Sequence, residues 1–282
     1  MKTIIANWKM NVGVRESVAL ARGTLLALRG RRILPEVVIC PPFIALSEVH
    51  KVVARSVVFL GAQNLFWEDH GAYTGEISGR MLTELGVSHV IVGHSERREY
   101  LGETDEMIRN KVTQALANQL NVIMCVGETA SERKSGEQRE RVRTQLVHVF
   151  AGVRLKSHER LMIAYEPVWA IGTGEIPEVA EVLAMNEYIR SILTDVLPEM
   201  DANKIRVLYG GSVEGNNAYS FLREQKIDGL LVGGASVKLN QLKVRGNKME
   251  AGMVLKTYAN ELNPRRFNPA FLQPHMHCAL GS

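Results

Sequence analysis

The sequence predicts an α/β protein whose eight parallel strands and intervening helices close into a single (β/α)8 barrel. Eight short apolar runs rich in β-branched residues recur along the chain, and amphipathic stretches lie between most of them. This alternation spans roughly 240 of the 282 residues, the usual length for such a barrel. A doubly wound open sheet is the alternative, and the strand count and total length favour the barrel. We therefore expect one barrel domain over residues 1–242.

The expected strands are nearly all apolar rather than alternating, as parallel strands covered on both faces should be. They are residues 3–7, 37–40, 57–61, 89–93, 121–126, 161–165, 205–208 and 229–232. Helices are expected at residues 15–29, 79–85, 103–119, 137–149 and 177–197. The last of these begins with Pro177 and carries Glu178 and Glu181, which suits a helix N-terminus.

Composition narrows the class of protein. Hydrophobic residues make up 46% of the chain and charged residues 23%, and the net charge is +4 with both signs interspersed. This mild bias suits a small anionic substrate better than nucleic acid. The first residues carry one Lys and a very short apolar run, so we expect no secretion signal, no membrane span and a cytoplasmic location. The three cysteines lack metal-site spacing, so reduced thiols are expected.

Residues 243–282 differ from the repeat. They lack a clear apolar period, so we expect a C-terminal extension that is mobile or loosely packed. An added contact between subunits and a metal site at His275, His277 and Cys278 are weaker alternatives.

The loops that follow the strands should build the active site, because their C-terminal ends meet on one face of a barrel. The first strand leads into Asn7 and Lys9, where a cation could meet a bound anion. A solvated surface Lys is the ordinary alternative. The fourth strand leads into His94, Ser95 and Glu96. We expect Ser95 to cap a helix there and the helix to disfavour a charged His94. A core histidine satisfied by the backbone is an equal alternative.

Glu166 follows the sixth strand and is a candidate general base, because a carboxylate at the end of an apolar strand is costly to bury. An ion pair with an arginine is the alternative. The next residues have an apolar centre between a proline and two glycines, which predicts a lid that folds over the pocket and excludes water. A packed surface loop is the alternative. The lid residues are Pro167, Val168, Trp169, Ala170, Ile171, Gly172, Thr173 and Gly174.

Glycine pairs follow the last two strands, at residues 210–211 and 233–234. Glycines allow backbone N–H groups to converge on an oxyanion. Two such turns after the seventh and eighth strands indicate a phosphate site.

Taken in order, these segments resemble the triosephosphate isomerase family over about residues 2–239. The segments that carry the resemblance are NWKMN (7–11), AQN (62–64), GAYTGEIS (71–78), GHSERR (93–98), CVGE (125–128), YEPVWAIGTG (165–174), YGGSV (209–213) and DGLLVGGAS (228–236). The ten-residue run at 165–174 is highly specific. The resemblance implies a cofactor-free and metal-free isomerase of glycolysis and gluconeogenesis that interconverts dihydroxyacetone phosphate and glyceraldehyde 3-phosphate.

The resemblance also implies the roles of individual residues. Glu166 would take the proton beside the carbonyl, neutral His94 would polarise that carbonyl, and Lys9 with Asn7 would neutralise the anion. Ser95 and Glu96 would position Lys9 and Glu166. The phosphate would accept hydrogen bonds from the backbone N–H groups of Gly172, Ser212, Gly233 and Gly234. Cys125 would be a buried packing and orientation residue rather than a nucleophile.

A homodimer is implied as well, with the loop at residues 71–78 inserted into a second copy. Thr74 would reach toward Asn7 and Glu96 of the partner subunit. The chain departs from the family at Glu175 and Ile176 after the lid, and in the KVRGNK segment where the last helix usually ends in apolar residues. Another phosphosugar barrel enzyme, a methylglyoxal-forming eliminase and a non-catalytic scaffold remain competing interpretations.

Overall fold

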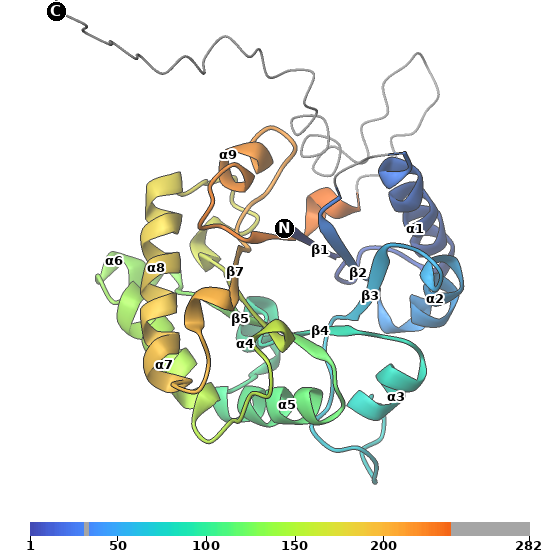
Figure 1. The fold of residues 1–282 in the computed structure, drawn as a ribbon, viewed down its shortest axis with the longest axis horizontal. Helices are drawn as coiled ribbons and strands as arrows, with labels where there is room; N and C mark the ends of the chain where they lie inside the picture. The colour runs from blue at the N-terminus through green and yellow to red at the C-terminus, as the bar shows by residue number, and fades with distance from the viewer. Residues whose placement is uncertain (31–33, 238–282) are drawn as a thin grey trace, which may run out of the picture.

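The computed structural model describes residues 1–30 and 34–237, and in this part of the chain eight parallel strands close into a barrel (Figure 1). Each strand pairs with the next in sequence, and β8 pairs with β1 to complete the ring. The predicted barrel is therefore confirmed and the open sheet is excluded. The strands are β1 (Thr3–Asn7), β2 (Glu36–Cys40), β3 (Val58–Ala62), β4 (His89–Val92), β5 (Asn121–Val126), β6 (Leu161–Tyr165), β7 (Arg206–Tyr209) and β8 (Gly229–Val232).

Four strands have the predicted bounds, β2 and β4 differ by one residue at one end, and β3 and β7 begin and end one residue later than predicted. The strand β4 ends before Gly93 because that residue takes a left-handed backbone, with φ at 72°, which cannot continue a strand. The strand β7 reaches Tyr209 because this residue pairs with Tyr165 on β6 and Leu230 on β8.

Helices surround the barrel, as the connections between parallel strands require. The α-helices are α1 (Val14–Leu28), α2 (Leu46–Val53), α3 (Gly79–Glu84), α4 (Ser95–Leu101), α5 (Asp105–Ala117), α6 (Ala130–Lys134), α7 (Gln138–Phe150), α8 (Val179–Val196) and α9 (Ala218–Leu222). Short 3₁₀ turns are η1 (Phe43–Ala45), η2 (His158–Arg160), η3 (Val168–Ala170), η4 (Ala202–Lys204) and η5 (Gly234–Ser236). The helix α8 begins just after Pro177, with Glu178 as its N-cap and Glu181 completing a capping box. The KVRGNK segment and the C-terminal extension lie outside the described residues.

The apolar core has two layers. A small inner cluster fills the barrel with side chains such as Ile5, Ile91, Met162 and Leu208. A larger outer cluster lies between the strands and the helices. Each fully buried aliphatic side chain contributes about 1.5–3 kcal/mol relative to exposure. These two layers hold the strand ends in fixed positions and so fix the site at their C-terminal edge.

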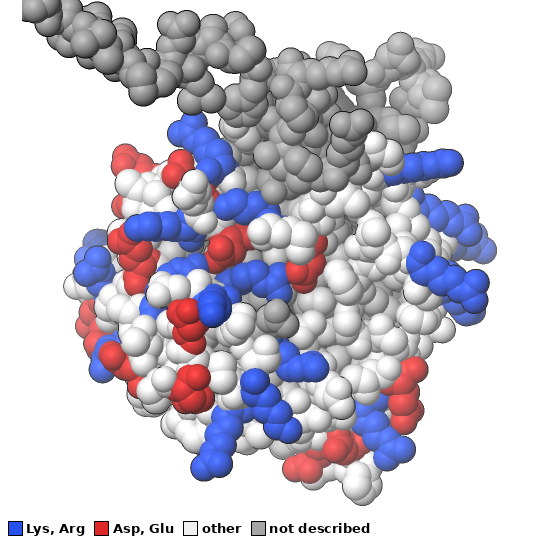
Figure 2. All heavy atoms as spheres, viewed as in Figure 1, with Lys and Arg blue, Asp and Glu red and all other residues white. Residues whose placement is uncertain are grey.

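The face seen in Figure 2 carries interspersed positive and negative side chains. This agrees with the mixed charge pattern of the sequence. No helix in residues 1–30 and 34–237 has the length and apolar character to cross a membrane.

A buried ion pair links α5 to neighbouring loops. Lys111 contacts the carboxylate of Glu103 and donates to Asn64 Oδ1 at 2.8 Å, and Arg97 Nε donates to Glu103 at 3.0 Å. Burial alone would raise the pKa of Glu103, but the charges and hydrogen bonds of Lys111 and Arg97 outweigh it and leave the pKa below its usual value. Burial lowers the pKa of Lys111, partly offset by Glu103.

Glu103→Gln should destabilise the fold by about 3 kcal/mol, because it leaves the Lys111 charge buried without its partner. Urea unfolding followed by circular dichroism measures this loss. Glu84→Gln, which breaks an exposed pair with Arg80, is the control and should leave the midpoint nearly unchanged. Equal effects of the two substitutions would contradict a structural role for the buried pair.

Candidate active site

A cavity of about 470 Å³ opens at the C-terminal ends of the strands. Every residue predicted to be catalytic or to bind substrate lines it: Asn7, Lys9, His94, Glu166, Gly172, Ser212, Gly233 and Gly234. The supporting residues Ser95 and Glu96 line it too. Residues from the first, fourth, sixth, seventh and eighth strand ends therefore meet in one place.

Glu166 lies on the wall of this cavity with only 2% of its surface exposed. Its backbone continues β6, since its N–H donates to Val126 O at 2.7 Å. One carboxylate oxygen, Oε2, accepts the Ser95 backbone N–H at 2.9 Å. The other, Oε1, lies 3.1 Å from His94 Nε2, outside ideal hydrogen-bond geometry. Among the described residues the side chain beside this oxygen is thus a histidine, and no ion pair joins Glu166 to an arginine as in the alternative interpretation.

Two glycines make room for Glu166. A Cβ on Gly127 would lie 1.7 Å from the backbone oxygen of Glu166. A Cβ on Gly210 would lie 3.0 Å from the Glu166 Cγ. A side chain at position 127 would displace the Glu166 backbone and one at position 210 would crowd the Glu166 side chain, so glycines follow β5 and β7 here.

His94 caps α4, and this corrects the prediction that Ser95 is the cap. The Glu96 backbone N–H donates to His94 Nδ1 at 3.2 Å, and Ser95 is the first helical residue. Because Nδ1 accepts this hydrogen bond, it carries no proton, and a single proton on Nε2 makes the imidazole neutral. The Nε2–H then faces Glu166 and the cavity.

Lys9 has an unusual backbone, with φ at 50°, which costs about 1–3 kcal/mol in a residue other than glycine. Its neighbours hold it there. Asn7 Oδ1 accepts the Lys9 N–H at 3.1 Å, and Gln63 Nε2 donates to the Lys9 carbonyl at 2.9 Å. The ammonium group contacts Glu96 Oε1 at 2.6 Å. The strained turn thus aims a cation into the cavity.

The glycine turns after β7 and β8 lie on one side of the same cavity. Asn217 fixes the first turn, because its side chain donates to Ser212 O at 3.1 Å and accepts the Glu214 N–H at 2.9 Å. A Cβ on Gly233 would come within 3.1 Å of Lys9 Cε, so glycine lets the lysine chain lie against the second turn.

The predicted lid contains η3 and two glycines with positive φ, Gly172 at 73° and Gly174 at 84°. Pro167 and Ala170 are buried, and Val168, Trp169 and Ile171 are half-buried rather than exposed. Gly172, Thr173 and Gly174 are exposed. Apolar residues of the lid therefore pack toward the protein, and its glycine-rich end projects into solvent.

Glu128 anchors the start of the lid, and sequence reasoning assigned it no role. Its Oε1 accepts hydrogen bonds from Trp169 Nε1 at 2.8 Å and from the Tyr165 hydroxyl at 3.1 Å. Burial raises the pKa of this carboxyl, although both hydrogen bonds oppose the rise. Gln63 and Asn217 were also missed. The contacts of Glu128, Gln63 and Asn217 form only in the folded barrel. The only sequence signal for these residues is that they lie in or beside the recognised motifs.

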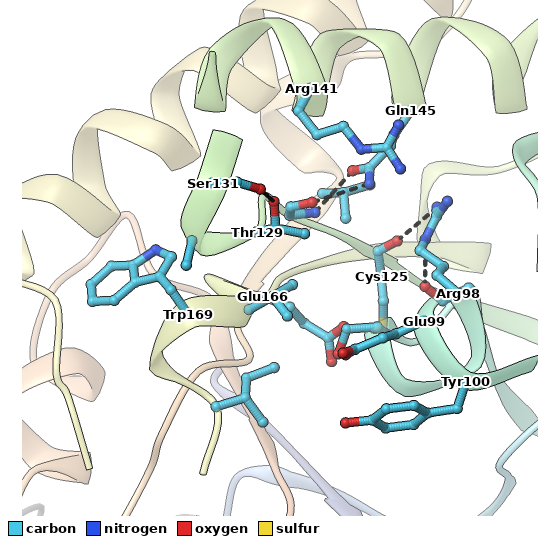
Figure 3. A pocket seen from close by; sticks show the side chains of 17 residues that line it. Arg98, Glu99, Tyr100, Cys125, Thr129, Ser131, Arg141, Gln145, Glu166 and Trp169 are labelled. Atoms are coloured by element: carbon cyan, nitrogen blue, oxygen red, sulfur yellow. Dashed lines mark hydrogen bonds between the residues drawn. The ribbon is translucent and has the colours of Figure 1, made fainter. Parts of the chain in front are cut away.

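A second cavity of about 730 Å³ adjoins the first, and Glu166 lines both. In Figure 3 it has Trp169 on one side and Arg98 and Tyr100 of α4 on the opposite side. Cys125 lines this cavity rather than the first. Burial, followed by the nearby Glu166 charge, raises the pKa of the Cys125 thiol well above its usual value, so it remains protonated.

Two sets of residues singled out from the sequence are not part of the site described above. Thr74 is exposed in the loop before α3, outside both cavities. The His275, His277 and Cys278 tract lies beyond residue 237, the last one described. Within the described ranges no group of three or more His, Cys, Asp or Glu side chains is placed to hold a metal ion.

Fold and site together define a (β/α)8-barrel enzyme. In its site a neutral imidazole faces a buried carboxylate, beside a cation and two glycine turns. Comparison with known proteins agrees. The family model described as triosephosphate isomerase matches residues 2–245. The chain belongs to the triosephosphate isomerase family, and it is an isomerase.

Individual relatives support this assignment. The chain is 44% identical to triosephosphate isomerase of Caldanaerobacter subterraneus subsp. tengcongensis over 234 residues, which cover 83% of this chain and 94% of the relative. It is 45% identical to that of Chlorobium phaeobacteroides over 237 residues, covering 84% and 94%. The crystal structure of triosephosphate isomerase from Bartonella henselae matches with a TM-score of 0.75 and 38% identity, covering 84% of this chain and 94% of that one.

Proposed function

We propose that this protein interconverts dihydroxyacetone phosphate and D-glyceraldehyde 3-phosphate in the cytoplasm, as a step of glycolysis and gluconeogenesis. The observation that carries the proposal is the Glu166 carboxylate, 3.1 Å from His94 Nε2 at the edge of a cavity that Lys9 also lines. A base, a neutral acid and a cation at one carbonyl are what an aldose–ketose isomerisation needs.

The reaction would proceed by proton transfer. Glu166 takes a proton from the carbon beside the substrate carbonyl, and the electron pair of that C–H bond forms the C=C bond of an enediolate. The Nε2–H of His94 stabilises the developing oxyanion and moves protons between the two oxygens. Glu166 then returns its proton to the neighbouring carbon, so no atom is gained or lost and no cofactor or metal takes part.

The other predicted residues would bind and position. Lys9 and Asn7 face the anionic groups, and the backbone N–H groups of Gly172, Ser212, Gly233 and Gly234 hold the phosphate. Ser95 and Glu96 hold Glu166 and Lys9 through the hydrogen bond and ion pair described above. Closing the lid excludes water, which protects the enediolate from losing phosphate. Cys125, protonated and buried, packs behind the base.

The alternatives fit less well. Other phosphosugar barrel enzymes share the glycine turns but not the set of Lys9, His94 and Glu166 under this lid. An eliminase needs the enediolate exposed, whereas the apolar part of this lid lies against the cavity. A scaffold has no use for a strained Lys9 or a buried Glu166.

We also propose that the chain forms a homodimer through the loop at residues 71–78. This loop projects between β3 and α3 (Figure 1), and residues 71–76 are all exposed. It is nonetheless ordered at its base, where Phe66 N donates to Ile77 O at 2.8 Å and the Phe66 ring packs on Tyr73. Exposed Met10 and Ile44, at 95% and 74%, offer apolar surface for a second copy to cover.

Thr74→Glu should shift the protein from dimer toward monomer and lower kcat/KM, because the new charge would approach Glu96 of the partner subunit. Sedimentation velocity across a concentration series, with activity measured on the same samples, checks this. Thr194→Glu is the matched control, since Thr194 is exposed on α8, across the barrel from α3. A fully active monomer of the unaltered chain would refute the dimer proposal.

Glu166→Gln should lower kcat for isomerisation by about 10³-fold, since the amide cannot accept the proton but keeps the size of the side chain. Coupled enzymatic reduction of the dihydroxyacetone phosphate formed from glyceraldehyde 3-phosphate measures it. Glu99→Gln, at an exposed carboxylate on the cavity rim, should change kcat little. An active Glu166→Gln variant would exclude Glu166 as the base, and an inactive but folded wild-type chain would favour the scaffold.

A further inference from the structure

Arg133 contacts the lid at Trp169 and also the first turn of α8, which follows the lid in the chain. This residue lies in α6, and its guanidinium stacks over the Trp169 ring with 4.2 Å between the guanidinium carbon and the ring centroid. The same group donates through Nη2 to Glu181 Oε1 at 2.7 Å. Trp169 belongs to the first half of the lid, and Glu181 belongs to the first turn of α8, which residues 175–178 separate from the lid. One side chain on a third element therefore joins the two segments that flank the lid's exposed glycines.

Both partners of Arg133 are themselves held by further hydrogen bonds. Trp169 donates to the buried Glu128, whose Oε1 also lies 3.9 Å from Arg133 Nη1. Glu181 uses its other oxygen, Oε2, to accept the Glu178 N–H at 3.3 Å in the capping box of α8. The helix α6 that carries Arg133 has its own capping box, formed by Thr129 and Glu132. Arg133 thus connects anchored groups and is no free surface charge.

Between these contacts the middle of the lid is bonded only within its own segment in the described hydrogen bonds. Thr173 Oγ1 donates to Trp169 O at 3.0 Å and accepts the Glu175 N–H at 3.2 Å. The stretch from Gly172 to Gly174 is exposed, and both glycines have positive φ. The larger cavity, about 730 Å³, lies under Val168, Trp169 and Ile171 and leaves space beneath the lid (Figure 3). A segment that is bonded only to itself, and whose flanking residues are already held in place, loses less conformational entropy on closing than one whose flanking residues are free.

We propose that Arg133 is a positioning residue that fixes the frame of the lid, so that the Gly172 N–H can reach a bound phosphate at low entropic cost. This inference rests on the proposed function. Arginine suits the role because its planar guanidinium stacks on an aromatic ring and pairs with a carboxylate at once, which lysine cannot do.

Arg133→Gln and Glu181→Gln test this inference. Both remove the ion pair, and glutamine at position 181 can still complete the capping box. The protein is labelled with 5-fluorotryptophan, and the Trp169 resonance among its three tryptophans is assigned with Trp169→Phe. Titration with sn-glycerol 3-phosphate, which has the phosphate but no carbonyl, then reports binding without turnover. Arg139→Gln is the matched control, because Arg139 stacks on Tyr188 of the same helix α8 but touches no lid residue in the described contacts.

In Arg133→Gln the Trp169 resonance should shift, and the affinity for sn-glycerol 3-phosphate should fall about fivefold, the size expected from a lost cation–π contact and ion pair. KM should rise by a similar factor while kcat changes less, because the proton-transfer groups are untouched. The double variant with Glu181→Gln should weaken binding less than the two single effects combined, because both act through one contact. Arg139→Gln should leave binding and the Trp169 resonance unchanged.

Unchanged affinity in Arg133→Gln, with or without a shifted Trp169 resonance, would overturn the inference and leave Arg133 a packing residue. An equal loss in Arg139→Gln would overturn it as well, since general destabilisation of α8 would then be the cause. A wild-type chain that neither binds the phosphate nor turns over glyceraldehyde 3-phosphate would instead refute the proposed function, and the inference would fall with it.

Discussion

The buried carboxylate of Glu166 is the constraint on which the rest of the site depends. A charge with so little contact with water is stable only where fixed dipoles replace the water. Ser95 N–H supplies one such dipole, and the His94 imidazole lies beside the second oxygen. That imidazole can face the carboxylate with its single proton only because its other nitrogen accepts the backbone N–H of Glu96. The start of α4 therefore determines both the resting position of the base and the protonation of its partner.

Close packing and local strain complete this arrangement. Gly127 and Gly210 leave the space that Glu166 occupies, and Gly233 leaves the space for the Lys9 chain. The left-handed backbone of Lys9 persists because Asn7 and Gln63 bind its amide and carbonyl groups. A strained backbone persists where neighbouring groups hold it, and at Lys9 this backbone directs the ammonium group into the cavity. The lid is held in a similar way, because Glu128 binds Trp169 in its first half and Glu181 lies in α8 beyond its exposed glycine-rich centre, with Arg133 contacting both Trp169 and Glu181.

The repeating apolar runs were enough to predict the barrel, because parallel strands buried on both faces leave a periodic signal. Glu166, His94 and Lys9 could be selected because each directly follows a strand, and strand ends must meet. The prediction that Ser95 caps α4 was wrong. N-cap propensity favours serine, whereas the turn before α4 directs the His94 ring at the free backbone N–H of Glu96. Glu128, Gln63 and Arg133 could not be found from the sequence, since their partners are 41, 54 and 48 residues away and meet only in the folded barrel.

Isomerisation of glyceraldehyde 3-phosphate in ²H₂O, followed by proton NMR, tests the central claim that Glu166 carries the proton between carbons. A carboxylate that holds the proton during the enediolate's lifetime exchanges it with solvent, so carbon-bound deuterium should appear in the dihydroxyacetone phosphate formed. Glu166→Gln should slow the formation of both the product and the label by about 10³-fold. Full turnover to a product wholly free of carbon-bound deuterium would indicate direct transfer between the carbons and would contradict this account.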